Sequence, residues 1–235
     1  MKENKVGKFI NFEGIDGSGK STQSKLFRKY LEEKGLNVVE ISFPQYGKKS
    51  AGLVEEYLSG KYGSSKDVGS YRASIFFACD RYDASFQIKK WLNENKIVIA
   101  DRYISSNAGH QGGKMSDPKE RTEFLTWLYD LEYGIFKIPR PDVVFILKTS
   151  SQIAKKMSGK VIDEDKKKKK ASFLGNKKRD IHELNLEHLE NALKSYLELA
   201  ERFPDDFKVI ECLENGKLLP IETIHQKILE EYNKL

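Results

Sequence analysis

Residues 14–21 read Gly-Ile-Asp-Gly-Ser-Gly-Lys-Ser, which matches the pattern G-x-x-x-x-G-K-[ST] in full. An apolar run at residues 9–12 precedes this stretch and predicts a strand, and residues 20–34 carry apolar side chains at helical spacing. The motif requires this order of strand, glycine-rich turn and helix. Residues 14–21 therefore predict a loop that binds phosphate groups at the start of a helix.

The chemistry of this loop indicates its ligand. Glycines allow backbone N–H groups to turn toward a phosphate, and the helix N-terminus adds partial positive charge. Lys20 would reach the β- and γ-phosphates of a nucleotide, and the Ser21 hydroxyl suits a magnesium ion. We therefore expect ATP and magnesium as cofactors. The expected nucleotide contacts are Gly14, Asp16, Gly17, Ser18, Gly19, Lys20, Ser21 and Thr22.

Strand and helix patterns alternate along the rest of the chain. Further strands are expected over residues 38–41, 97–100, 143–147 and 208–212. Helices are expected over residues 51–59, 71–93, 118–133, 150–157, 181–203 and 221–232. The sequence thus predicts an α/β fold of the P-loop NTPase type, a five-stranded parallel sheet with helices on both faces.

Length and composition predict one domain of 235 residues, with a mobile lid in the aperiodic, charge-rich stretch at about residues 155–180. The net charge of +6 is local, because residues 166–170 are five consecutive lysines. We therefore expect no nucleic-acid-binding face. Cys79 and Cys212 are too few for a disulfide framework, and no apolar run suggests a signal peptide or a membrane span. A cytoplasmic protein without membrane contact is expected.

A regulatory GTPase is one alternative use of such a loop. Its guanine signature, Asn-Lys-x-Asp, is nearly matched by residues 176–179, but Arg179 stands where a carboxylate would read guanine. No Asp-x-x-Gly motif occurs outside the phosphate loop. The sequence therefore disfavours a GTP-dependent switch.

The triplet Asp101-Arg102-Tyr103, at the end of the third expected strand, bears on the phosphate acceptor. Ligands of open α/β sheets bind at the carboxyl ends of strands, and a guanidinium can hold a phosphate through two parallel hydrogen bonds. The triplet resembles the D-R-[YFH] motif of thymidylate kinases. This resemblance implies that Asp101 lies near magnesium and that Arg102 holds the acceptor phosphate.

Two further segments resemble the parts of thymidylate kinases that hold the nucleoside. Residues 76–81 read Phe-Phe-Ala-Cys-Asp-Arg and are similar to the helix that covers the base. Phe77 would stack on the base, and Arg81, on the same helix face, would contact a base oxygen. Residues 105–112 read Ser-Ser-Asn-Ala-Gly-His-Gln-Gly. Their resemblance to a polar stretch of the family implies nucleoside contacts from Ser106, Asn107 and Gln111.

Three positions depart from the family pattern. His110 stands where the family usually has Tyr or Phe against the sugar. Residues 43–46 read Phe-Pro-Gln-Tyr and resemble the family's F-P-E-R loop, so Phe43 and Pro44 would line the acceptor site while its arginine is missing. Gly17 stands where one branch of the family has an additional arginine.

Because Gly17 leaves the phosphate loop without that arginine, the resemblance implies that a catalytic cation comes from the lid. Arg179 is the only arginine there, so the expected catalytic set is Lys20, Asp101, Arg102 and Arg179. The resemblance implies a homodimer that transfers the γ-phosphate of ATP to thymidine monophosphate (dTMP), giving dTDP and ADP. The alternative is a deoxynucleoside kinase or a kinase of another nucleoside monophosphate. A nucleoside kinase would need a carboxylate base where Gln45 stands.

Overall fold

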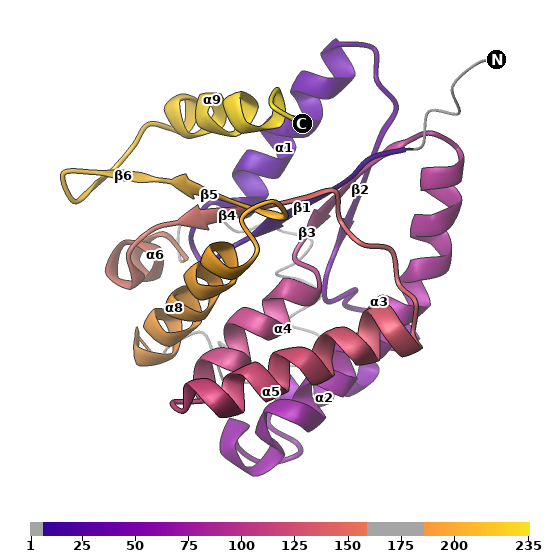
Figure 1. Cartoon of the computed structure of the whole chain (residues 1–235), viewed down its shortest axis with the longest axis vertical. Coiled ribbons are helices and arrows are strands. Elements are labelled where there is room, and N and C mark those ends of the chain that lie inside the picture. Colours follow the sequence, from indigo (N-terminus) through magenta and orange to yellow (C-terminus); the bar gives the residue numbers. More distant parts are fainter. Residues whose placement is uncertain (1–6, 159–185) are drawn as a thin grey trace.

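A five-stranded parallel sheet organises the chain, in the strand order β2-β3-β1-β4-β5 (Figure 1). The computed structural model describes residues 7–158 and 186–235. The five strands are β1 (Phe9–Glu13), β2 (Val38–Ser42), β3 (Ile97–Asp101), β4 (Val143–Lys148) and β5 (Phe207–Glu211). Strand β1 lies in the centre and pairs in parallel with β3 and β4. The predicted sheet is therefore confirmed.

Helices cover both faces of this sheet (Figure 1). One face carries α1 (Lys20–Glu33) and α9 (Ile221–Tyr232). The other carries α3 (Ser65–Asn93), α4 (Ile104–His110), α5 (Pro118–Tyr129) and α8 (Leu186–Arg202). Two short helices, α2 (Gly52–Leu58) and α6 (Ser151–Met157), lie at the margins of these layers. A small hairpin of β6 (Leu213–Glu214) and β7 (Lys217–Leu218) precedes α9.

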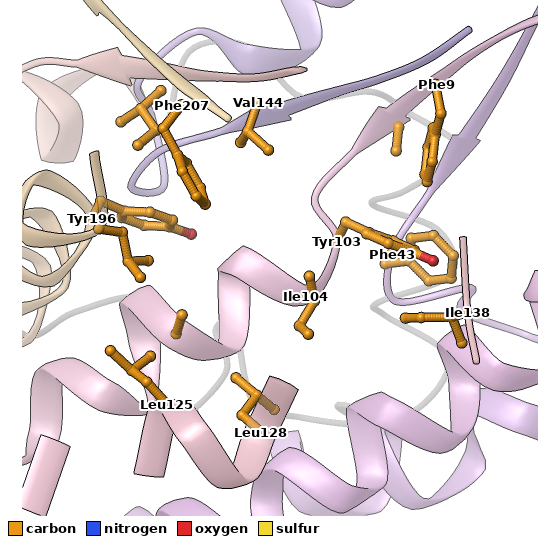
Figure 2. Packing of buried hydrophobic residues seen from close by; sticks show 14 of the residues in the cluster. Phe9, Phe43, Tyr103, Ile104, Leu125, Leu128, Ile138, Val144, Tyr196 and Phe207 are labelled. Carbon is orange, nitrogen blue, oxygen red and sulfur yellow. The ribbon is translucent and has the colours of Figure 1, made fainter. Parts of the chain in front are cut away.

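The alternation of side chains along β1 decides which face can hold a site. Ile10 and Phe12 point into the apolar core beneath α1 and α9. Phe9 points the other way, into the cluster beneath α3, α4, α5 and α8, part of which Figure 2 shows. Asn11 and Glu13 share the direction of Phe9, so a buried amide and a buried carboxylate face α4 and α8.

Several element boundaries differ from the predicted ones. Helix α3 begins earlier because Ser64 and Asp67 form a capping box, and Gly69 interrupts it with φ 75°. Helix α4 was not expected, because its sequence contains Ser, Asn and Gly, which favour caps and turns. Helix α5 continues as a wider turn over Asp130–Ile135. The lid prediction falls, after Ser158, outside the described residues.

Within residues 7–158 and 186–235, none of the helices combines the length and the apolar character needed to cross a membrane.

Candidate active site

The phosphate loop connects β1 to α1, and its backbone has the geometry of an anion cradle. Gly14, Gly17 and Gly19 have φ values of 135°, 86° and 92°, which residues with a side chain rarely adopt. The Ser18 hydroxyl is buried in this loop and has no hydrogen-bond partner within the part of the chain that the structure describes. A buried polar atom without a partner at this place is suited to an incoming polar ligand.

Lys20 lies folded onto the same loop. Its Nζ donates to the backbone carbonyls of Gly14 at 2.9 Å and Ile15 at 2.8 Å. Burial, assisted by the charge of Arg102, lowers the pKa of Lys20 to about 8. Among the described residues no carboxylate is bonded to this ammonium, and a phosphate placed there would favour its charged form.

The glycine at position 17 is required by packing. A Cβ at this position would lie 2.0 Å from the carbonyl oxygen of Ala154 on α6. Helix α6 therefore packs directly against the loop, where a larger residue at position 17 would need that space. The absence of an arginine there, noted from the sequence, has this steric reason.

Arg102 connects the phosphate loop to α4. Its Nη2 donates to Asp16 Oδ1 at 2.5 Å, and its Nη1 lies 3.3 Å from Ser106 Oγ and 3.0 Å from His110 Nε2. Burial alone would lower the pKa of Arg102, but Asp16 keeps it raised. The structure thus brings together Asp16, Arg102 and Ser106, three of the residues that the sequence assigned to the acceptor. Arg102 has φ 72°, a backbone conformation that residues with a side chain rarely adopt.

Glu13 is a site residue that the sequence analysis missed. It is fully buried at the end of β1, and four donors surround its carboxylate. Oε1 accepts from the Tyr103 backbone N–H at 2.8 Å and from the Asn11 amide at 3.1 Å. Oε2 accepts from Ser106 Oγ at 2.8 Å and from Tyr196 Oη at 2.9 Å. Glu13 therefore fixes the start of α4 and the middle of α8 against the phosphate loop.

The two amides assigned to the nucleoside have fixed orientations. Asn107 Nδ2 donates to the Ser74 carbonyl at 3.1 Å, and Gln111 Oε1 accepts from Lys114 Nζ at 2.6 Å. Burial lowers the pKa of Lys114 to about 8. Both amides are buried, and each has its other polar atom available for a further partner.

The aromatic residues assigned to the nucleoside lie on two elements. Phe77 is half-buried on α3 and meets the Tyr57 ring edge-on, with centroids 6.2 Å apart. Phe43 is buried against the Tyr103 ring at 5.6 Å, and Pro44 follows it at partial exposure. In the same loop, Tyr46 stands where the family pattern has its arginine, and it packs against the same buried cluster as Phe77.

Arg81 has a partner that the sequence did not suggest. Its Nε and Nη2 each donate to the Glu132 carboxylate at 2.6 Å, and the side chains of the pair are 1% and 0% exposed. Nη1 reaches toward the Tyr103 carbonyl at 3.5 Å. The contact of Arg81 with a base oxygen stays a prediction, which only the N–H groups not accepted by Glu132 can fulfil.

Ser21 and Asp101 fit the magnesium expected from the sequence. Both offer oxygen ligands, which magnesium prefers, together with waters and phosphate oxygens. Ser21 lies in the first turn of α1, and the charge of Asp101 acts on both Lys20 and Arg102, so this carboxylate lies at the loop. Arg179, the expected lid cation, lies outside the described residues.

Comparisons with known proteins agree on one family. A family model described as thymidylate kinase matches residues 12–228. A probable thymidylate kinase of Thermococcus kodakarensis is 34% identical over 229 residues, covering 94% of this chain and 95% of the relative. The crystal structure of thymidylate kinase from Ehrlichia chaffeensis has a TM-score of 0.65 at 26% identity, covering 97% of this chain and 99% of its own. The Candida albicans thymidylate kinase structure, at 23% identity and a TM-score of 0.70, supports the fold.

Proposed function

Because the chain belongs to the thymidylate kinase family, we propose that it transfers the γ-phosphate of ATP to dTMP, giving dTDP and ADP. It is an ATP-dependent kinase of nucleotide biosynthesis. The observation that supports the acceptor most strongly is Arg102, held by Asp16 beside the phosphate loop at 2.5 Å. The alternative of a deoxynucleoside kinase is not favoured by these comparisons.

The reaction proposed at this site needs position and positive charge more than covalent chemistry. The dTMP phosphate oxygen attacks the γ-phosphorus in line, so no side chain acts as a nucleophile. Lys20 leaves the loop carbonyls for the β- and γ-phosphates, and Arg102 binds the dTMP phosphate. Asp16, which forms an ion pair with Arg102, faces the acceptor. Binding of both substrates replaces water around the transferring group by fixed charges.

Magnesium fits the oxygen atoms of Ser21 and Asp101 in this proposal. When bound, it supplies positive charge to the oxygens of the transferring phosphate. The two residues that would hold it come from the start of α1, which follows β1, and from the end of β3, and these two strands are neighbours in the sheet.

The nucleoside of dTMP is placed between α3 and α4. Phe77 stacks on the base, while Asn107 and Gln111 contact its polar edge, with Ser106 nearer the phosphate. Phe43 and Pro44, which directly follow β2, line the side of the nucleoside site nearest that strand. Fixed amide orientations support this assignment, because an amide that cannot flip presents a defined donor or acceptor. Arg81 is proposed to reach the base from beneath Phe77.

The lid at about residues 155–180 is proposed to supply the last catalytic cation, Arg179, to a single 235-residue kinase domain. Position 17 has no room for an arginine, because helix α6 packs against the phosphate loop there, so the cation has to come from another segment. A cytoplasmic location is also proposed, and the two free cysteines, Cys79 and Cys212, agree with a reducing compartment.

A homodimer through α3 is proposed from an exposed apolar stripe. Ile75, Tyr82 and Phe86 share one face of α3 and are 40%, 42% and 61% exposed. An apolar stripe of this kind favours contact with another apolar surface, and α3 of a second copy offers the same stripe in a two-fold arrangement.

The acceptor assignment is tested by the Arg102→Ala variant. Loss of the guanidinium should raise KM for dTMP about 10-fold to 100-fold, because hydrogen bonds to a charged group are lost, with a much smaller change in KM for ATP. Arg28→Ala is the matched control, since Arg28 pairs with Glu32 and Glu40 on the outside of α1. An equal rise of both KM values would contradict the assignment of Arg102 to dTMP.

A further inference from the structure

Two histidines lie in line with the acceptor arginine. His110, at the end of α4, has its Nε2 3.0 Å from Nη1 of Arg102 and its Nδ1 3.2 Å from Nε2 of His188 on α8. The two rings are nearly parallel, with an angle of 28° and centroids 5.4 Å apart. A chain of three polar side chains therefore runs from the acceptor site to α8.

The chemistry of Arg102 fixes the protonation of both rings. A guanidinium has only N–H donors, so Nε2 of His110 must accept and cannot hold a proton. In a neutral ring the proton then lies on Nδ1, which donates to His188, and Nε2 of His188 must also be an acceptor. The hydrogen bonds are thus donated from Arg102 to His110 and from His110 to His188. Both imidazole rings must be neutral for these two hydrogen bonds to form.

The surroundings of His110 agree with a neutral ring. Burial, together with Arg102 and His188, holds the pKa of His110 well below its usual value. Among the described residues, the charged groups that act on it include Asp16 and Lys20 from the phosphate loop and Arg102 after β3. From α8, the ring of Tyr196 meets it edge-on at 5.9 Å, and the Tyr196 hydroxyl is bonded to Glu13.

We propose that His110 and His188 form a positioning relay, which holds the Arg102 guanidinium in place for the acceptor phosphate while both rings are neutral. Asp16 holds Nη2, while His110 and Ser106 both accept from Nη1, with His110 the nearer of the two. His188 orients the His110 ring and prevents it from presenting an N–H to Arg102. The relay rests on the proposed role of Arg102, and neither histidine touches a reacting atom.

The tautomers can be tested without any enzymatic activity. We would record the ¹⁵N imidazole resonances of the full-length, ligand-free protein and assign them with the variants His110→Gln and His188→Gln. The relay predicts neutral His110 with its proton on Nδ1 at about pH 7.5. A proton on Nε2, or a charged ring at that pH, would overturn the proposal. This readout is independent of the proposed reaction.

The positioning role is tested by two variants of His188 in steady-state kinetics. His188→Leu removes the acceptor and should raise KM for dTMP about tenfold, the effect of leaving a buried donor unpaired, with KM for ATP nearly unchanged. His188→Gln keeps an oxygen acceptor at similar reach and should restore most of the affinity. His225→Gln, on α9 at the other face of the sheet, is the control for loss of a histidine. Equal losses in both His188 variants, or equal effects on both substrates, would show that the ring only packs.

Discussion

Removal of the Arg81 side chain should destabilise the protein strongly, for a reason that does not depend on its substrate. Arg81 and Glu132 form a two-bond ion pair with both distances 2.6 Å and side-chain exposures of 1% and 0%. In Arg81→Ala the carboxylate of Glu132 would stay buried with its charge unpaired. Burial already raises the pKa of Glu132 although Arg81 opposes this, so the unpaired charge is unfavourable.

The expected size follows from measurements on pairs of this kind. Loss of one partner of a buried ion pair costs about 3–5 kcal/mol of unfolding free energy. For a chain of this length, about 1 kcal/mol shifts the thermal midpoint by about 2–4 °C, which gives a fall of about 6–20 °C. The deficit should grow as pH rises above the ordinary range of a glutamate, about 4.3, because protonated Glu132 is tolerated in the folded state and the carboxylate is not.

Thermal unfolding of the ligand-free protein, followed by circular dichroism, measures this effect. The double variant Arg81→Met with Glu132→Leu removes both charges and should recover most of the loss. Arg28→Ala serves as the control, because its ion pairs are exposed and a surface pair contributes about 0–1 kcal/mol. A fall of less than about 2 °C in Arg81→Ala, or no recovery in the double variant, would refute the reasoning.

The proposed contact of Arg81 with the base has its own readout. If Arg81 also binds dTMP, the folded fraction of Arg81→Ala should show a larger rise in KM for dTMP than in KM for ATP. The double variant should then recover stability without recovering dTMP affinity. Equal effects on both substrates would leave Arg81 with its structural role alone.

Four further predictions concern the phosphate loop and the transferring phosphate. Lys20→Ala should reduce kcat at least about 100-fold, the scale of one lost transition-state donor, with an unchanged thermal midpoint in the absence of ATP. In the wild type, ATP affinity should fall as pH rises through about 8, where Lys20 loses its charge, and isothermal titration would measure this. Gly17→Ala should lower both stability and ATP affinity, because its Cβ would lie 2.0 Å from an α6 carbonyl; Gly35→Ala, with open space around it, should have a smaller effect on the thermal midpoint. Arg179→Ala should reduce kcat about 10-fold to 1,000-fold at saturating substrates. If replacement of residues 166–170 by serine slows turnover and Arg179→Ala does not, the catalytic cation has been assigned to the wrong residue.

The fold could be predicted because its signals are local. The phosphate loop occupies residues 14–21, and the five strands are short apolar runs separated by helical patterns. Helix α4 escaped prediction because packing against α8 holds Ser, Asn and Gly in a helix that they do not favour alone. Local pattern therefore predicted the sheet better than it predicted the helix nearest the acceptor.

The contacts that position the candidate site could not be predicted, because they join distant parts of the chain. Tyr196 reaches Glu13 across 183 positions, and Glu132 reaches Arg81 across 51. One signal was present for Glu13, since an acidic residue at the end of an all-buried strand needs polar partners. The helical pattern of residues 71–93 placed Arg81 on a helix, but only the structure shows that its guanidinium pairs with Glu132.

The most direct measurement of the central claim is a panel of phosphate acceptors assayed with ATP and magnesium on the purified protein. ADP formation would be followed with dTMP, with cytidine, uridine and guanosine monophosphates, and with thymidine. The proposed function predicts the highest kcat/KM for dTMP, dTDP as the product, and little turnover of thymidine, because Arg102 requires a phosphate on the acceptor. Faster phosphorylation of thymidine than of dTMP, or preference for another monophosphate, would contradict it.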